Sequence, residues 1–159
     1  EIYTLSLHDA LPIWENNDEI QIMKLLYQSL RALTKKSLDK ELVRYIYELK
    51  IFTYAGEYPE VFQCTQCGNE EHLKRFSMFQ AGMVCEECKS KARDGLELNP
   101  STVYTMQYIV STEVEKLYTF TVSEEVLAEL RMVMDRWRER YLDKTMKSLE
   151  ILESVKDIC

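Results

Sequence analysis

Glycine and proline are scarce in this sequence, which has only 4 and 3 of them among its 159 residues. Proteins built only from strands need both residues at their many tight turns, so the scarcity favours helices. Long apolar runs are also absent, and none approaches the roughly 20 residues that a membrane-spanning helix needs. We therefore expect a mainly helical protein that is soluble, cytoplasmic and not bound to a membrane.

A surplus of positive charge is missing as well. Lys and Arg number 20 against 27 Asp and Glu, which gives a formal net charge of −7. This balance excludes the overall basic footprint of many nucleic-acid-binding domains, so any contact with nucleic acid must come from a local patch. The 2 histidines belong to no Ser/His/Asp set, and no glycine-rich phosphate loop is present. We therefore predict that the protein is not an enzyme.

The first thirteen residues, EIYTLSLHDALPI, are expected to be foreign to the protein. They begin without Met and lack the basic region of a signal peptide. They match, letter for letter, the translation of a common sequencing adapter. We therefore predict that residues 1–13 are non-native and that the native part begins near Trp14, as a fragment of a longer protein.

Cysteine is infrequent, but four of the five cysteines follow a regular pattern. Cys64 and Cys67 form one Cys-x-x-Cys pair, Cys85 and Cys88 form another, and seventeen residues separate the pairs. This spacing is typical of a four-thiolate zinc site, in which each pair holds the ion from one tight turn. Four thiolates leave no coordination position for water or substrate. We therefore predict a structural Zn²⁺ ion at these four residues.

The segment around these pairs is expected to form a small ribbon. Phe76–Phe79 and Met83–Val84 predict two short strands joined by a turn, and Lys89–Leu98 predicts a polar connection. Other uses of paired cysteines fit less well: a redox pair is expected near a βαβ pattern, and disulfides need an oxidising compartment that no secretory signal supports. A zinc deaminase needs a His-x-Glu motif, whereas Leu73 and Lys74 follow His72, which we expect to be a solvated loop residue.

Apolar residues recur at helical spacing on both sides of the cysteine segment, and they predict four helices. The apolar stripes consist, in chain order, of Ile20, Met23, Tyr27, Leu30 and Leu33; of Leu38, Leu42, Tyr45, Leu49 and Phe52; of Val103, Met106 and Ile109; and of Leu127, Leu130, Met134, Trp137 and Tyr141. The predicted fold is mainly α, a helical bundle with an inserted small zinc-ribbon module whose ion is held by four cysteines. We expect N-terminal helices in 14–61, the zinc-binding module in 62–91 and C-terminal helices in 92–159.

Residues that favour helix ends mark the boundaries of these helices. Ser37 is the expected N-cap of the second helix, and Gly56 is expected to follow its last turn. Asn99 and Pro100 predict the start of the third helix, because Asn caps it and proline is tolerated in the first turn. Ser123 is expected to begin the last long helix.

A basic line is predicted on the C-terminal helix. It consists of Arg131, Arg136, Arg138, Arg140, Lys144 and Lys147, which stand against Asp135, Glu139 and Asp143. Like charges four residues apart on a helix cost about 0.2–0.5 kcal/mol per pair, a cost that suits a surface receiving phosphates or an acidic peptide. The simpler interpretation is a solvated helix face whose carboxylates neutralise the cations, and the sequence favours that interpretation.

Several short motifs follow one another in a specific order: Tyr47-Glu-Leu-Lys-Ile51, Gly56-Glu-Tyr-Pro59, Cys64-x-x-Cys67-Gly68, Phe76-Ser77, Ala81-Gly82, Cys85-x-x-Cys88, and the ending Arg140-Tyr-Leu-Asp-Lys144 with Lys147-Ser-Leu149. In these motifs the chain resembles the C-terminal part of the bacterial DNA repair protein RecO family of recombination mediators. The resemblance rests on the motifs and their order. It covers essentially Trp14 to Val155. The two cysteine pairs alone are common to many proteins, whereas their order relative to the other motifs is more specific.

The resemblance implies an N-terminal OB-fold followed by a helical domain that carries the zinc module. It implies a cytoplasmic, nucleoid-associated protein that binds single- and double-stranded DNA without enzymatic activity and anneals complementary strands. It further implies three partners: RecR, the RecA recombinase that it helps to load, and the acidic C-terminal tail of single-stranded-DNA-binding protein. By position, the four cysteines are implied as zinc ligands, and the residues around Arg140, Lys144 and Lys147 as a DNA or partner face.

This sequence departs from the family because the OB-fold is missing. An OB-fold supplies the basic groove and the stacking aromatic residues typical of single-strand binding, so we expect weak DNA affinity from this chain alone. The alternative interpretation is a generic zinc-ribbon module that contacts nucleic acid or protein without annealing strands. An enzyme with structural zinc is the weakest interpretation, because the sequence offers no catalytic set.

Overall fold

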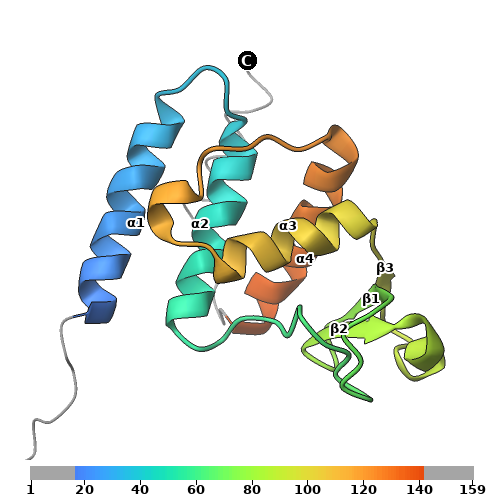
Figure 1. Cartoon of the computed structure of the whole chain (residues 1–159). Coiled ribbons are helices and arrows are strands. Elements are labelled where there is room, and N and C mark those ends of the chain that lie inside the picture. The colour runs from blue at the N-terminus through green and yellow to red at the C-terminus, as the bar shows by residue number, and fades with distance from the viewer. Residues whose placement is uncertain (1–16, 142–159) are drawn as a thin grey trace, which may run out of the picture.

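The computed structural model describes residues 17–141, and the protein is mainly helical there with one small sheet. The elements are, in order, α1 (Asn17–Leu33), α2 (Lys40–Tyr54), β1 (Leu73–Ser77), β2 (Gly82–Cys85), the 3₁₀ turn η1 (Glu86–Lys91), β3 (Leu96–Glu97), α3 (Pro100–Ser111), the 3₁₀ turn η2 (Val114–Lys116) and α4 (Glu124–Tyr141). Figure 1 shows α1 alongside α2, α3 crossing α4, and the sheet beyond one end of this pair. Within the described range, no helix is both long and apolar enough to cross a membrane.

Helices α2, α3 and α4 supply most of the core of the described residues. The apolar face of α2 is broad, and Leu42, Tyr45 and Leu49 are fully buried there, as the pattern predicts. On α4 the side chain of Trp137 is fully buried, its ring lies 6.0 Å from that of Phe76 in the sheet, and its Nε1 donates to the Glu57 carbonyl at 2.9 Å. Trp137 therefore joins the helices to the sheet.

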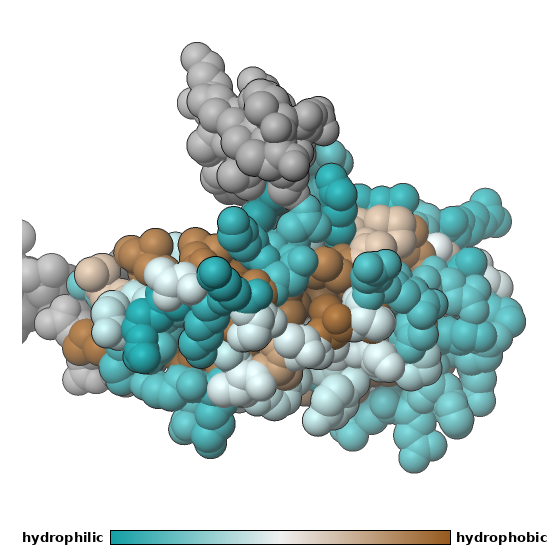
Figure 2. Space-filling model, turned by 90° about the horizontal axis from the view of Figure 1, so that it is seen from above, coloured by the Kyte–Doolittle hydropathy of each residue, from teal (hydrophilic) through white to brown (hydrophobic). Residues whose placement is uncertain are grey.

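The apolar stripe predicted for the first helix lies on its exposed side. The exposed fractions of Met23, Tyr27 and Leu30 are 65%, 59% and 56%, whereas Leu25 and Ala32 are buried. Figure 2 shows apolar surface on the side of the molecule where α1 lies. Both faces of α1 carry apolar residues, so the spacing predicts an amphipathic helix but does not determine which face packs against α2.

The structure confirms three of the predicted helix-end signals and contradicts one. Ser123 directly precedes α4, and its hydroxyl accepts from the Val126 amide at 3.3 Å. The Asn99 side chain accepts from the Ser101 amide and begins α3. Gly56 follows α2 in the left-handed conformation, at φ +74°, which glycine adopts without steric cost. The predicted cap Ser37 is wrong: Asp39 caps α2 and accepts the Glu41 amide at 2.7 Å. The chain turns once more after Ser37, so the first helical residue comes later.

The sheet has the order β2-β1-β3, and both pairings are antiparallel. The predicted hairpin is confirmed, although β1 begins earlier and ends at Ser77, which leaves Phe79 in the turn. Strand β3 was not predicted, because two residues are too short to show an alternating pattern. Gly82 lies so close to the Glu60 backbone that an added Cβ would meet the Glu60 oxygen at 2.4 Å. This glycine therefore lets the segment before the first cysteine pair cross the hairpin.

Candidate metal centre

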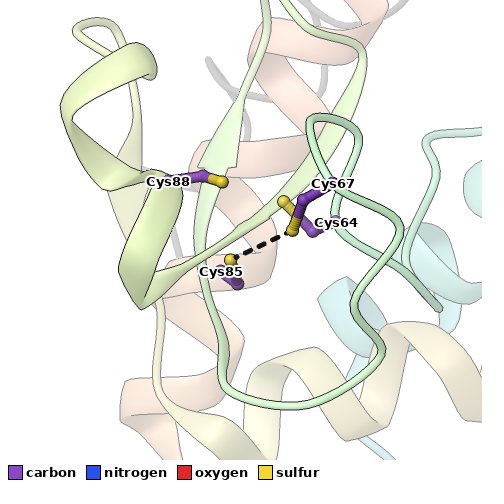
Figure 3. Close-up of side chains that lie close together, drawn as sticks. All are labelled: Cys64, Cys67, Cys85 and Cys88. Atoms are coloured by element: carbon purple, nitrogen blue, oxygen red, sulfur yellow. Dashed lines mark hydrogen bonds between the residues drawn. The ribbon is translucent and has the colours of Figure 1, made fainter.

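The four predicted cysteines come together from three separate segments (Figure 3). Cys64 and Cys67 lie on the loop that leads from α2 to β1, Cys85 ends β2, and Cys88 lies in η1. The structure therefore assembles the set that the spacing predicts, with one pair on each side of the hairpin.

The first pair is held by a tight turn. The Gly68 amide donates to the Cys64 carbonyl at 2.8 Å, and the Cys64 amide donates to the Asn69 carbonyl at 2.7 Å. Gly68 has φ +73°, in the left-handed region where glycine is favoured. The turn is also attached to the sheet, because the Thr65 amide donates to the Met83 carbonyl at 2.9 Å. These bonds position the backbone that carries both cysteines.

The sulfurs have the separation of metal ligands. All four Sγ atoms lie within 4.8 Å of one another, and those of Cys67 and Cys85 are 3.7 Å apart. A disulfide would place its sulfurs about 2.05 Å apart, so the four thiols are free. Zn–S bonds of about 2.3 Å in a tetrahedron put the sulfurs about 3.8 Å apart, close to the observed separation. The cluster could therefore hold one tetrahedral metal ion.

Burial makes the cluster a poor place for several thiolates without a cation. Cys64, Cys85 and Cys88 are buried, and Val84, Ala92 and Leu73 pack against them. Burial opposes ionisation of Cys64, but backbone N–H groups at Cys85, Gln66 and Cys67 outweigh it and hold the pKa of Cys64 at about 6. Burial, together with the neighbouring sulfurs, raises the pKa of Cys88 to about 12.

Repulsion between the sulfurs adds to the effect of burial on the pKa of Cys88. The first thiolate to form in the cluster disfavours the next, because like charges at this separation repel. A divalent cation would remove this penalty and bring the other sulfurs into their charged form. The set contains four sulfur ligands and no open position, so it suits a structural ion rather than a catalytic one.

His72 lies near the cluster but is not part of it. Its side chain is exposed, and its φ is +54°, in the left-handed region. Its carbonyl accepts from the Glu86 amide at 3.1 Å, so its backbone helps to join the two sides of the site. This position agrees with the expectation of a solvated loop residue.

The structure divides the predicted basic line. Arg138 is half-buried and pairs with Asp135 at 2.8 Å and with Glu48 at 3.4 Å, and Arg131 lies 3.9 Å from Asp135. Arg140 donates to the Met78 carbonyl in the hairpin turn. Arg136 is exposed and makes no ion pair with residues 17–141. Lys144 and Lys147 lie outside the described residues. Of the four cations of the basic line that lie in residues 17–141, Arg136 and Arg140 are therefore the two that pair with no carboxylate of that range.

A buried lysine was not recognised from the sequence. Lys50 is 4% exposed, and its Nζ donates to the carbonyls of Ile109, Val110 and Thr112 at 3.1, 2.8 and 2.7 Å. Burial lowers the pKa of this ammonium group, while the carbonyls at the end of α3 favour its charged form. Its position within the apolar stripe of the second helix was the available signal, since charged residues rarely occupy such a face.

Comparisons with known proteins found a matching family model and several named relatives. The protein-family model described as "Recombination protein O C terminal" matches residues 7–150, a range that begins inside the segment predicted to be foreign. The chain is 31% identical over 156 residues to a protein of Caldicellulosiruptor saccharolyticus named "DNA repair protein RecO", covering 97% of this chain and 62% of the relative. Proteins with the same name from Thermoanaerobacter sp. and Bacillus subtilis are 26% and 24% identical, with 91% and 86% of this chain and 58% and 53% of the relatives covered. The chain thus spans roughly 60% of the length of the first two relatives.

Proposed function

The chain belongs to the family described as recombination protein O C terminal, and from this membership we propose that it acts in bacterial DNA repair and recombination. This proposal rests on the family match over residues 7–150, together with the shared name of the relatives. We propose a non-enzymatic mediator in the cytoplasm, on the nucleoid, that supports strand annealing and the loading of RecA. The part of the relatives that this chain does not span is expected to contribute the larger share of the DNA affinity.

We propose that Zn²⁺ occupies the four-cysteine cluster and makes the sheet a zinc ribbon inserted in a helical bundle. Cys64, Cys67, Cys85 and Cys88 would hold the ion, and its role would be structural. The separation of the sulfurs and the left-handed turn at Gly68 support this assignment. A sheet of this size buries too little apolar surface to be stable alone, so the ion would supply much of its folding energy.

We propose that DNA or a partner protein contacts the exposed side of α4 near its end. The proposed partners are single- and double-stranded DNA, RecR and the acidic tail of single-stranded-DNA-binding protein. Arg136 and Arg140 support this placement, because no carboxylate among residues 17–141 pairs with either of them. Arg131 and Arg138 contribute less, because Asp135 and Glu48 already compensate their charge.

One observation favours a second candidate, a zinc-ribbon module that binds a partner protein without annealing strands. The ion pairs of Arg131 and Arg138 reduce the positive potential of the basic line, and the net charge of the whole chain is −7. A surface of this kind attracts a polyanion less strongly than a continuous basic groove does. We rank this candidate second, because the family match extends well beyond the cysteine segment.

A chimera tests the proposed function. The part of the Caldicellulosiruptor saccharolyticus relative that precedes the matched region is joined to residues 14–159 of this chain. We expect the chimera to anneal complementary strands coated with single-stranded-DNA-binding protein. Arg140→Glu combined with Lys144→Glu should slow annealing about tenfold, because a chain with fewer cations neutralises fewer phosphates and releases fewer counterions when it binds DNA.

Lys35→Glu combined with Lys36→Glu provides the matched control, because these cations are exposed between α1 and α2. The control should anneal at the rate of the unaltered chimera. A folded chimera that cannot anneal, as monitored by fluorescence energy transfer between labelled strands, would contradict the mediator proposal. Equal effects of both charge reversals would mean that the end of α4 has no special role.

A further inference from the structure

The turn between β1 and β2 presents an aromatic ring to solvent. Phe79 is 85% exposed, more than any other large apolar residue in the described part of the chain. Its neighbours Met78 and Gln80 are half-buried, so the turn itself packs against the protein while this one ring projects from it. The ring contributes little to the core, and its exposure calls for a different explanation.

The turn is fixed by hydrogen bonds to residues 91–94, which follow the second cysteine pair. The Asp94 carboxylate accepts from the Ser77 hydroxyl at 2.7 Å and from the Phe79 amide at 2.9 Å. The Gln80 side chain donates to the Lys91 carbonyl at 2.8 Å. Ala81 has φ +56°, a left-handed conformation that residues other than glycine adopt infrequently. The backbone that carries the ring is therefore held in place, which reduces the entropy lost on binding.

The segments that hydrogen-bond to this turn carry three cations. Arg140 of α4 donates to the Met78 carbonyl, directly before Phe79 in the chain. Lys91 and Arg93 are exposed. The Lys91 carbonyl accepts a hydrogen bond from the turn, and Arg93 directly precedes Asp94, whose carboxylate accepts another. Asp94 adds one carboxylate, which accepts two hydrogen bonds from the hairpin, so these four charged residues have a net charge of +2. The surroundings of the ring thus favour a polyanion.

We propose that Phe79 is a stacking platform for one base of single-stranded DNA, with Arg140, Lys91 and Arg93 near the flanking phosphates. This inference rests on the proposed function and assigns a specific residue to its DNA contact. Every base has a π-face, so stacking on an aromatic side chain tolerates any sequence. A ring that projects from a turn can reach an unpaired base but not a base inside a duplex, so the site selects single strands.

Photocross-linking and binding measurements with this chain test the proposal. The probe is a fluorescein-labelled oligonucleotide of about 16 nucleotides that contains 5-iodouracil, at low salt. We expect mass spectrometry to find the cross-link at Phe79. Phe79→Ala and Phe79→Leu should weaken binding measured by fluorescence anisotropy by about 5- to 100-fold, and Phe79→Tyr should keep the affinity of the unaltered chain.

Tyr104→Ala is the matched control, because Tyr104 is an aromatic residue of α3 that is 67% exposed and away from the turn. It should bind like the unaltered chain, and circular dichroism should show that all variants are folded. If Phe79→Leu keeps full affinity, the ring is a general apolar contact, suited to a protein partner, and the stacking proposal is wrong. Equal binding by Phe79→Ala would overturn it as well.

Failure of this proposal is distinguishable from failure of the proposed function. Cross-links confined to other residues would overturn the role of Phe79 and leave DNA binding intact. The absence of any cross-link, with a chimera that still anneals, would also overturn the role of Phe79 while the mediator function stands. The absence of both cross-linking and annealing would contradict the two proposals together.

Discussion

At the scale of single residues, buried polar groups fix how distant segments meet. Lys50 of α2 donates to three carbonyls at the end of α3, where an α-helix leaves its last carbonyls without internal partners. Ser29 of α1 shares a hydrogen bond of 2.5 Å with the hydroxyl of Tyr118, which follows η2. Both contacts join residues that are far apart in the sequence and explain why a lysine and a serine occupy buried positions.

The burial of Tyr118 predicts a dependence of stability on alkaline pH. Burial, the largest cause, raises the pKa of Tyr118 to about 12, above its ordinary value of 10.0. Because the folded-state pKa is the higher one, the stabilisation is complete below pH 10 and is lost as the pH rises toward 12. We expect a loss of about 3 kcal/mol in the free energy of unfolding over this window.

Tyr118→Phe tests this dependence by removing the titrating hydroxyl. The variant should be about 1 kcal/mol less stable at neutral pH, because one hydrogen bond is lost. The difference in stability between the two proteins should shrink and reverse between pH 10 and pH 12 in urea titrations. Tyr27→Phe, a change at an exposed tyrosine of α1, is the control and should follow the unaltered protein. A difference that is constant with pH would show that Tyr118 titrates normally.

At the scale of elements, α1 shows how packing chooses between two faces of one helix. The packed face carries Leu25, Ser29 and Ala32, and the exposed face carries larger apolar side chains such as Met23 and Leu30. Small residues at a helix contact let the backbones approach closely, and the hydroxyl of Ser29 finds its acceptor in the Leu25 carbonyl at 2.6 Å. The face with the greater apolar area therefore remains on the surface of the described part.

Two alanine substitutions on α1 distinguish its faces. Leu25→Ala should lower the free energy of unfolding by about 3 kcal/mol, because it leaves a cavity between α1 and α2. Met23→Ala removes a side chain that is 65% exposed, so it should change stability by less than about 0.5 kcal/mol. Urea denaturation followed by circular dichroism measures both. The opposite ranking would mean that the predicted stripe, rather than the observed face, packs against the protein.

At the scale of the whole molecule, the sheet and the metal centre lie beyond one end of the helices (Figure 1). The chain leaves α2 at Gly56, passes through the cysteine loop and the sheet, and re-enters the helices at Asn99. Contacts between β1 and α3, together with Trp137, attach the sheet to the core. The ion proposed at the four cysteines would therefore order the segment that connects these two helices.

Loss of one thiolate should release the metal and loosen this segment. Cys64→Ser is expected to abolish stoichiometric zinc, because apparent binding free energies of structural zinc sites are about 10–16 kcal/mol and depend on all ligands. Atomic absorption measures the metal, and hydrogen exchange should show faster exchange in β1 and β2 with little change in α2. Cys159→Ser is the control, since that cysteine belongs to neither Cys-x-x-Cys pair. Unchanged zinc in Cys64→Ser would contradict the site, and iron in the unaltered protein would contradict the choice of ion.

The sequence by itself determined the features whose physics is local. Two residues between cysteines fix a turn that can hold an ion, and Gly56, Asn99 and Pro100 act on backbone groups within one helical turn. The mainly helical fold, the hairpin and the four gathered cysteines could therefore be predicted. The tertiary structure alone decided which face of α1 is buried, that Lys50 is buried, and that Arg138 pairs with Glu48 instead of facing solvent. These outcomes depend on groups distant in the sequence, whose shape and charge no local pattern contains.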